Sequence, residues 1–328
     1  MPDTQVRYAL TRACLTFGPI VHIMRSVPPE LVRRKAWEYD VLIRSALADL
    51  LGLPVVPFAA WEQASLGVRL GGLGLRSCER HLEAAFIGGC HQGAREDGWV
   101  LEADVAYMTS VSTFMARFPG PGVLPGDSQK DLSCLIEWDQ FSSLIDSFLP
   151  RTSDPIALAV ADYHRGRLFS VAKPEAGVFW NAIPSKVLNL DIAPAYFTVI
   201  AKWWLGLEIY PEAATCRKGN CANTCDRLGL HALTCMCGGN HGVRHHAIRN
   251  IIHDVALRGG ITCAKERSIG FEGRPADVWL DYPGFLQAID VAITHPLQSI
   301  YLAGVLTSTI DELKSSQVGQ PHQRSGSL

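Results

Sequence analysis

Five of the ten cysteines in this 328-residue chain fall in one short stretch, between Cys216 and Cys237. The stretch is rich in Gly and Asn, so little else in it could hold a fold together without a metal. The first residues lack the secretory pattern of a basic start, an apolar middle and a small-residue cleavage site. In an intracellular chain, crowded cysteines indicate a metal site rather than disulfides.

The spacing within the stretch is typical of a zinc knuckle. Structural zinc takes four nitrogen or sulfur ligands, usually as two close pairs. Cys216 and Cys221 are separated by four residues, and His231 and Cys235 by three. The residues 226–229, Asp-Arg-Leu-Gly, are predicted to form the turn that folds one pair back on the other.

Other ligand sets are compatible with the same stretch. Cys225 and Cys237 are spare thiols, and Cys221 with Cys225 is an alternative first pair. Cys237 or His241 could replace the last ligand. The competing interpretation is a cluster of reduced cysteines that binds no metal.

Two aspartates downstream of the cysteines form a second candidate site. Asp277 opens one predicted strand, Ala276–Leu280, and Asp290 lies on another, Leu286–Ile293, with a turn of Asp-Tyr-Pro-Gly between them. Adjacent antiparallel strands are about 5 Å apart, so the two carboxylates could share one ion. Mg²⁺ or Mn²⁺ held in this way can polarise a phosphodiester and generate a hydroxide.

The elements around these aspartates follow the order helix, strand, strand, strand, helix. The first helix is predicted at Val243–Arg258, the first strand at Ile261–Glu266 and the last helix at Leu297–Lys314. This order fits a restriction-type nuclease core, whose motif places a lysine two residues after the second acidic residue. Position 292 is Ala, so Lys314 is predicted as a displaced catalytic lysine and Glu266 as a third carboxylate.

Basic residues gather near both sites although the net charge of the chain is −2. Arg244 and His245 stand at the start of a predicted helix, a position that favours phosphate. With Arg249 and Arg274 they are predicted to contact nucleic acid, because phosphate binding depends on the local field and not on the whole-chain sum. A solvated basic turn is the alternative for Arg244 and His245.

The sequence before residue 211 is predicted to be mostly helical. Prolines and helical apolar spacing indicate a helix over Pro28–Leu51, whose Arg33, Arg34 and Lys35 are assigned to a solvated face. Four glycines predict a tight loop over Trp61–Ser77, with helical periodicity resuming at 78–88. Further helices are predicted near 100–118, 131–148 and 155–165, with a turn-rich linker at 119–130.

Taken together, these motifs resemble the C-terminal region of non-LTR retrotransposon polyproteins. In members with a restriction-like endonuclease, a CCHC knuckle precedes RHN-type, RPD-type and DVTV-type motifs. The counterparts here, besides the four predicted zinc ligands, are Arg244-His245-His246, Arg274-Pro275-Ala276-Asp277 and Asp290-Val291-Ala292-Ile293. His246 stands where Asn is usual, and Ala276 is inserted. Residues 24–40 and 61–86 are also similar to the region after the reverse-transcriptase palm.

The resemblance implies an α+β chain in five parts. These are a helical post-palm region at 1–125, a helical linker region at 126–210, the zinc knuckle at 211–242, a small α/β restriction-endonuclease-like core at 243–315 and a disordered tail at 316–328. The core is expected to be truncated, because its last helix is followed by polar residues where the family has a final strand. A partial or degenerate element copy is therefore expected.

The implied function is a metal-dependent DNA endonuclease, active or inactive, with structural Zn²⁺ and catalytic Mg²⁺ or Mn²⁺. No Asp-Asp pair of the kind a polymerase palm uses occurs in the sequence, so this chain carries no polymerase active site. The alternative is a non-catalytic, zinc-dependent nucleic-acid-binding remnant, and a third hypothesis is a chain that does not fold stably alone. DNA or RNA is the expected partner, without a membrane, in the nucleus or cytoplasm.

Overall fold

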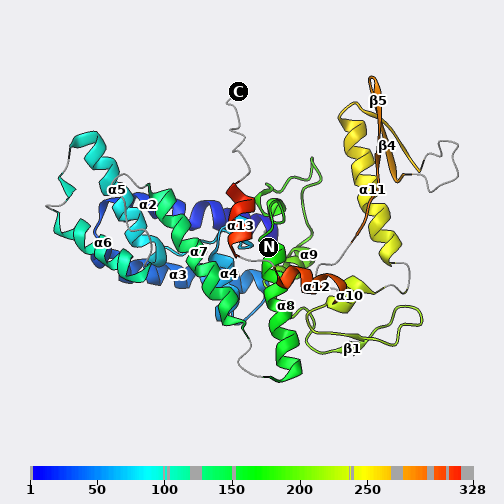
Figure 1. Ribbon diagram of the computed structural model, residues 1–328, viewed down its shortest axis with the longest axis horizontal. Helices are drawn as coiled ribbons and strands as arrows, with labels where there is room; N and C mark the ends of the chain where they lie inside the picture. Colours follow the sequence, from blue (N-terminus) through cyan, green and yellow to red (C-terminus); the bar gives the residue numbers. More distant parts are fainter. Residues whose placement is uncertain are drawn as a thin grey trace. The chain divides into compact units, whose positions relative to one another are not determined.

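The computed structural model describes residues 3–98, 100–101, 104–118, 128–149, 153–235, 237, 240–266, 276–293, 299–307 and 310–318. The chain divides into two compact units (Figure 1): unit 1 comprises Met1–Leu207 and Leu302–Leu328, and unit 2 comprises Glu208–Tyr301. Helices and two small antiparallel sheets together make it a mixed α+β protein, as the sequence predicts. Within the described residues, no helix combines the length and apolarity that crossing a membrane requires.

Unit 1 is built from helices. In chain order they are α1 (Thr4–Leu10), the π-helical η1 (Thr11–Leu15), α2 (Phe17–Ser26), α3 (Pro29–Leu51), α4 (Phe58–Ser65), the short 3₁₀ turns η2 (Val68–Leu70) and η3 (Glu79–His81), α5 (Leu82–Asp97), α6 (Val105–Arg117), α7 (Gln129–Ser147), α8 (Pro155–Val171), the 3₁₀ turn η5 (Val178–Asn181) and α9 (Pro194–Trp204). α12 (Ser299–Leu306) and α13 (Ile310–Val318) follow unit 2 in the sequence, and α13 belongs to unit 1.

Local sequence signals explain where several of these helices begin and end. α3 starts with proline in its first turn and ends at Gly52, whose φ of +63° suits glycine. Ser128 and Asp131 form a capping box at the start of α7. Asp154 caps α8 through two backbone N–H groups. The helices predicted over these segments are therefore confirmed.

The core of unit 1 joins parts of the chain that are distant in sequence. One cluster packs α3 and α4 against α9, with Leu47, Leu51 and Trp204 among its buried members. A second places Leu313 of α13 against Phe141 of α7. The regions predicted at 1–125 and 126–210 therefore share buried clusters within unit 1, because α4 and α5 both pack on α7.

Two local predictions need correction. α4 extends through Ser65, so Trp61–Ser65 is helical; the four glycines of the expected loop all come later, from Gly67 onward. The single helix predicted over 297–314 is two helices, α12 and α13. α9 lies within the region 126–210 that was predicted to be helical, although its bounds were not predicted. Residues 119–127 of the predicted linker and 319–328 of the predicted tail lie outside the described residues, and residues 316–318 end α13.

Unit 2 contains the knuckle and the small sheet. β1 (Ala214–Thr215) pairs with β2 (Thr224–Cys225), and the short helix α10 (Leu230–Thr234) follows. α11 (Asn240–Arg258) then packs on an antiparallel sheet in the order β3 (Thr262–Lys265), β4 (Val278–Tyr282), β5 (Phe285–Ile289). Its small core includes Ala256, Val278 and Leu280.

The turns of this sheet follow the glycines that the sequence supplies. α11 ends at Gly259-Gly260, and the φ of Gly260 is +74°. β4 and β5 are joined by Pro283-Gly284, where Gly284 adopts a φ of +96°. The predicted helix and the hairpin connection are confirmed, but the strand bounds differ from those predicted. The turn is Pro283-Gly284 and not 281–284, and Asp277 and Asp290, which were predicted on the strands, lie one residue outside β4 and β5. The register fixes which side chains of β4 and β5 are neighbours.

Candidate functional site

A short hairpin carries the first half of the cysteine cluster. The Cys216 N–H donates to the carbonyl of Asn223 at 2.9 Å, directly after the β1–β2 pair. The Cys221 N–H donates to the carbonyl of Lys218 at 3.1 Å, which closes a turn around Gly219. Cys216 and Cys221 therefore lie at the two ends of one tight turn.

The second half is carried by α10. Asp226 caps this helix by accepting from the N–H groups of Leu230 at 3.0 Å and His231 at 2.8 Å. The Gly229 N–H donates to the Asp226 carbonyl, which is the turn predicted at 226–229. The Cys235 N–H donates to the His231 carbonyl at 2.8 Å, so both side chains lie on one helical turn.

Four ligand atoms converge between these halves. The sulfurs of Cys216, Cys221 and Cys235 and a ring nitrogen of His231 all lie within 4.8 Å of one another. The Cys216 and Cys235 sulfurs are 3.9 Å apart, and the Cys221 sulfur is 3.4 Å from His231 Nε2. Among the described residues, this is the one group of three or more Cys, His, Asp or Glu side chains whose ligand atoms lie close enough together to hold an ion. A Cys₃His group that could hold a metal is therefore present.

The thiols of Cys216 and Cys235 have pKa values shifted in opposite directions. The backbone N–H of Lys218 lowers the pKa of Cys216 to about 7, opposed by burial. For Cys235, the backbone of Cys237 acts to lower the pKa, but burial and the neighbouring Cys216 and Cys221 sulfurs outweigh it and raise the pKa to about 11. A metal bound here would displace protons, because thiolates and not thiols are the ligands.

Two further thiols lie against the four-atom group. Burial, together with contact with the Cys216 sulfur, raises the pKa of Cys225. Contact with the Cys221 sulfur does the same for the pKa of Cys237. The side chain of His241, another predicted alternative ligand, lies outside the described residues.

The two aspartates meet at the open end of the β4–β5 hairpin. Val278 pairs with Ile289, so Asp277 and Asp290 are the next residues facing each other. Asp290 Oδ1 accepts from the Asp277 N–H at 3.4 Å, and Asp277 Oδ2 accepts from the Val291 N–H at 2.6 Å. His245 Nε2 of α11 lies 3.1 Å from the same oxygen of Asp277.

Of the other predicted site residues, some lie near the aspartates and some do not. Glu266 pairs with Arg249, and its N–H donates to the Asp277 carbonyl at 3.2 Å, so it borders the aspartates through the backbone. Arg244 donates to the Leu233 carbonyl and thereby ties α11 to α10. Arg274 lies outside the described residues.

Lys314 is placed in unit 1 and not in the unit of the aspartates. Its ammonium lies 5.5 Å from the centre of the Trp138 ring and 3.8 Å from an Asp311 oxygen. The displaced-lysine role therefore stays a prediction, and the structure gives this side chain a packing role on α13.

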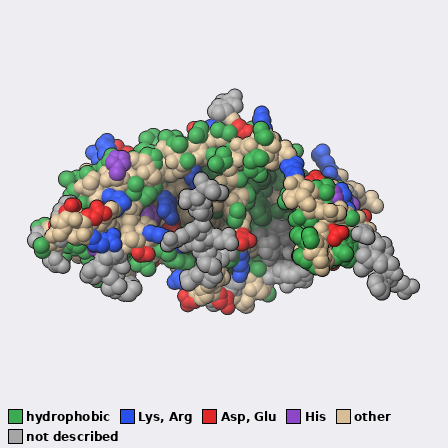
Figure 2. Space-filling view, turned by 90° about the horizontal axis from the view of Figure 1, so that it is seen from above, with side chains coloured by type: hydrophobic (Ala, Val, Ile, Leu, Met, Phe, Trp, Pro, Cys, Tyr) green, Lys and Arg blue, Asp and Glu red, His purple; other side chains and the backbone are tan. Residues whose placement is uncertain are grey.

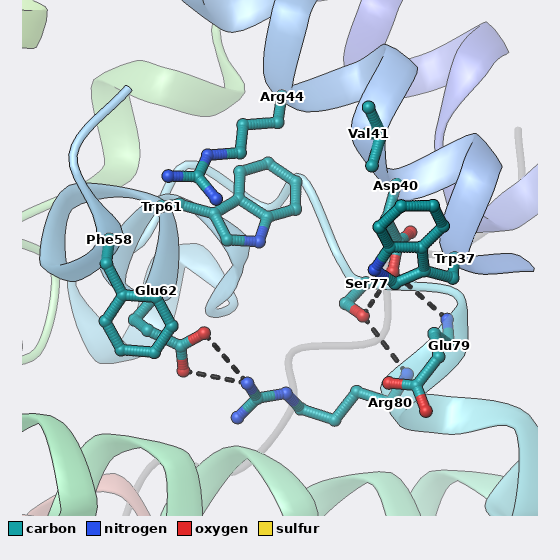
Figure 3. Close-up of a pocket in the computed structure, with 10 residues that line it drawn as sticks. All are labelled: Trp37, Asp40, Val41, Arg44, Phe58, Trp61, Glu62, Ser77, Glu79 and Arg80. Atoms are coloured by element: carbon teal, nitrogen blue, oxygen red, sulfur yellow. Dashed lines mark hydrogen bonds and ion pairs between the residues drawn. The ribbon is translucent and has the colours of Figure 1, made fainter. Parts of the chain in front are cut away.

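Sequence reasoning missed a polar pocket of about 240 Å³ in unit 1 (Figure 3). Asp40 of α3 forms part of its wall, accepting from the Ser77 hydroxyl at 2.6 Å and the Cys78 N–H at 2.7 Å. Arg80 donates to both oxygens of Glu62 at 2.8 Å. The sequence did carry a signal for this pocket, because Asp40 lies on the apolar side of the helix predicted over 28–51. The structure agrees, since only 9% of the Asp40 surface is exposed.

The three basic residues near the start of α3 are paired with carboxylates. Arg33 pairs with Glu79 and Glu83, and Arg34 and Lys35 both pair with Glu38. Basic and acidic side chains are interspersed over the face seen in Figure 2. The assignment of residues 33–35 to a solvated face, and not to a phosphate site, agrees with this pairing.

No family model matches the chain, and no curated protein matches it.

Proposed function

We propose that unit 2 is a zinc-stabilised, metal-dependent DNA endonuclease module of the kind found in non-LTR retrotransposons. The observation that carries the proposal is the register of β4 and β5, which makes Asp277 and Asp290 neighbours within reach of His245. Paired carboxylates beside an imidazole at the end of a short sheet suit phosphodiester hydrolysis.

Zinc is the metal that best fits the Cys₃His group. Tetrahedral zinc with bonds of about 2.3 Å to sulfur and about 2.0 Å to nitrogen separates its ligands by roughly 3.4–3.8 Å. The distances of 3.9 Å between the Cys216 and Cys235 sulfurs and 3.4 Å between Cys221 and His231 agree with this. All four positions are supplied by the protein, which is the pattern of a structural and not a catalytic site.

At the aspartates, each side chain has a distinct part. Asp277 is held by the Val291 N–H and by His245, so its carboxylate keeps one orientation. Asp290 is placed next to it through the hydrogen bond that its Oδ1 accepts from the Asp277 N–H. A bound Mg²⁺ or Mn²⁺ would supply Lewis-acid polarisation of the phosphate and a lowered pKa for the attacking water. His245 is close enough to Asp277 to accept or release a proton at Nε2.

A non-catalytic nucleic-acid-binding module is the second candidate. It is favoured by the chemistry around the aspartates: Ala292 occupies the position of the family's lysine, and Lys314 packs against Trp138. Among the residues that the structure describes, no third carboxylate joins the pair closely enough to form a metal group.

One nicking experiment separates the two candidates. Supercoiled plasmid is incubated with Mg²⁺ or Mn²⁺ and the wild-type protein, Asp277→Asn or Asp290→Asn, with Asp281→Asn as the matched control because it is an exposed carboxylate on β4. We expect both site variants to lose nicking by about 100-fold or more, since a lost metal ligand forfeits several kcal/mol of transition-state stabilisation.

The other outcomes are equally informative. Salt-sensitive DNA binding by every protein, with nicking by none, would establish the second candidate. Nicking that survives in both site variants would place the chemistry outside the aspartate pair and remove the proposed active site.

A further inference from the structure

The polar pocket of unit 1 has walls from three helical segments (Figure 3). Trp37, Val41 and Arg44 recur at helical spacing on one face of α3, and Phe58 and Trp61 come from α4. The turn η3 completes the lining. The volume of about 240 Å³ lies below the roughly 300–1,000 Å³ usual for small-molecule sites, so the pocket suits a ligand as small as one ring system.

Aromatic rings stand at the entrance of this pocket. Trp37 and Phe58 are 60% and 70% exposed, whereas Trp61 is 9% exposed. In the view of Figure 3 the Trp61 ring lies between the other two. Exposed aromatic rings beside hydrogen-bonding groups provide a stacking surface for a planar ligand.

The charges of the pocket nearly balance. Arg80 donates to both oxygens of Glu62 at 2.8 Å, and Glu79 pairs with an arginine outside the lining. Asp40 and Arg44 are instead bonded to neutral groups, and they share one face of α3 because they are four positions apart. A cation would meet Arg44 and an anion would meet Asp40, so the pocket favours a neutral ligand with both donors and acceptors.

Two side chains of the pocket keep hydrogen-bonding capacity. A carboxylate has about four acceptor sites, and Arg80 occupies one on each oxygen of Glu62, so each oxygen can accept again. Arg44 donates through Nε and Nη2 to the Val56 carbonyl, which leaves other N–H groups of its guanidinium for a ligand. The pocket therefore offers a pair of acceptors from α4 and a donor from α3.

We propose that this pocket binds the guanine base of a nucleotide. Guanine is planar and neutral, and its N1–H and N2 amino group are adjacent donors beside the O6 acceptor. Glu62 accepts from the two donors, Arg44 donates to O6, and the base stacks on Trp37. Adenine, cytosine and uracil each lack the two adjacent donors. The proposal concerns unit 1 and is independent of the nuclease chemistry proposed for unit 2.

The first test is calorimetric titration of the full-length chain with guanosine monophosphate and with the inosine, adenosine, cytidine and uridine monophosphates. Inosine monophosphate is the sharpest comparison, because its base differs from guanine only by the missing N2 amino group. We expect it to bind about tenfold more weakly than guanosine monophosphate, the effect of losing one hydrogen bond to a charged acceptor. Equal binding of all five nucleotides, or no binding of guanosine monophosphate, would overturn the proposal.

Three variants test the assignment of the side chains, with circular dichroism to check that each is folded. Trp37→Ala removes an exposed ring and should weaken guanosine monophosphate about tenfold or more through lost stacking. Glu62→Gln should weaken guanosine monophosphate more than inosine monophosphate, a change in selectivity that misfolding cannot produce. Leu42→Ala is the matched control, since Leu42 is exposed on α3 but does not line the pocket. Undiminished binding by Trp37→Ala would place the nucleotide elsewhere and overturn the proposal.

A further titration distinguishes the two sources of a guanine base, a free nucleotide and an unpaired residue in a strand. A short uridine strand with one central guanine is compared with the same strand without guanine and with guanosine monophosphate. Tighter binding of the guanine-containing strand than of the mononucleotide assigns the pocket to an unpaired guanine in a strand, and the reverse order assigns it to a free nucleotide. Equal binding of the two strands, together with no binding of the mononucleotide, would overturn the proposal.

Discussion

His81 illustrates how much one buried side chain can set the pH dependence of unit 1. Its side chain is fully buried, its Nδ1 lies 2.9 Å from the Ser77 carbonyl, and the Phe17 ring packs against it. Burial lowers the pKa of His81 to about 4. His164, stacked on Phe148, has its pKa lowered to about 4 for the same reason.

The sign of the effect follows from these depressed values. Between pH 6.5 and 4 the unfolded chain binds protons at these histidines and the folded chain does not, so stability falls as pH falls. We expect His81→Asn to reduce the stability lost between pH 7 and 4.5 by about 2 kcal/mol, measured by urea unfolding at both values. The exposed His22 provides the control substitution, His22→Asn. An unchanged pH difference in His81→Asn would contradict the assignment.

Among the elements, α2 and α5 pack directly on each other, and α5 presents a glycine at the contact. A Cβ added at Gly89 would lie 2.3 Å from the carbonyl oxygen of Arg25 in α2. Backbone atoms cannot move aside as a flexible side chain can, so the two helices would have to separate.

Alanine scanning of these glycines gives an element-scale prediction. Gly89→Ala should destabilise unit 1 by about 1–3 kcal/mol, the usual cost of overpacking a close contact. Gly18 of α2 is the matched control, because a Cβ there meets nothing within 4 Å; Gly18→Ala should stabilise the chain by up to about 1 kcal/mol through helix propensity. Thermal melts of both variants provide the measurement. A neutral Gly89→Ala would mean that the α2–α5 contact is looser than described.

Helices and turns with strong local sequence signals could be predicted from the sequence. The distant residues against which they pack could not. Three features could be predicted because each depends on residues that are only a few positions apart: the prolines of α3, the cap of α8 and the hairpin turn at Pro283-Gly284. The members of the Cys₃His group were predictable from their spacing in the sequence. The contact of Asp40 with Ser77 and the packing of Lys314 on Trp138 depend on residues 37 and 176 positions apart, which spacing rules do not reach.

At the scale of the whole molecule, the two units differ in the amount of hydrophobic core that stabilises them. Unit 1 has several buried clusters, whereas the described core of unit 2 has a single small one around Ala256, Val278 and Leu280. The knuckle contributes only two-residue strands and a five-residue helix. We therefore expect metal coordination at the Cys₃His group to supply much of the folding free energy of this segment.

Chelation should consequently act on one unit alone. After zinc is removed with EDTA, we expect backbone amides of residues 216–235 to lose protection from hydrogen exchange, while those of α5 keep it. His231→Ala should show the same pattern without chelator, and Cys14→Ser, at an exposed cysteine, should behave as wild type. Unchanged protection of 216–235 in metal-free protein would show that the knuckle folds without an ion.

The N-terminal helix has its partners far along the chain. Gln5 donates to the carbonyl of Leu190 and accepts from the N–H of Ile192, and the Tyr8 ring packs against Trp180 and Phe197. During synthesis at about 5–20 residues per second, α1 leaves the ribosome roughly 10–40 seconds before these partners exist. The Tyr8 hydroxyl can donate to the Leu73 carbonyl early in that interval, but its ring cannot pack against Trp180 and Phe197 until α9 has been made. This part of the core of unit 1 is therefore completed late in synthesis.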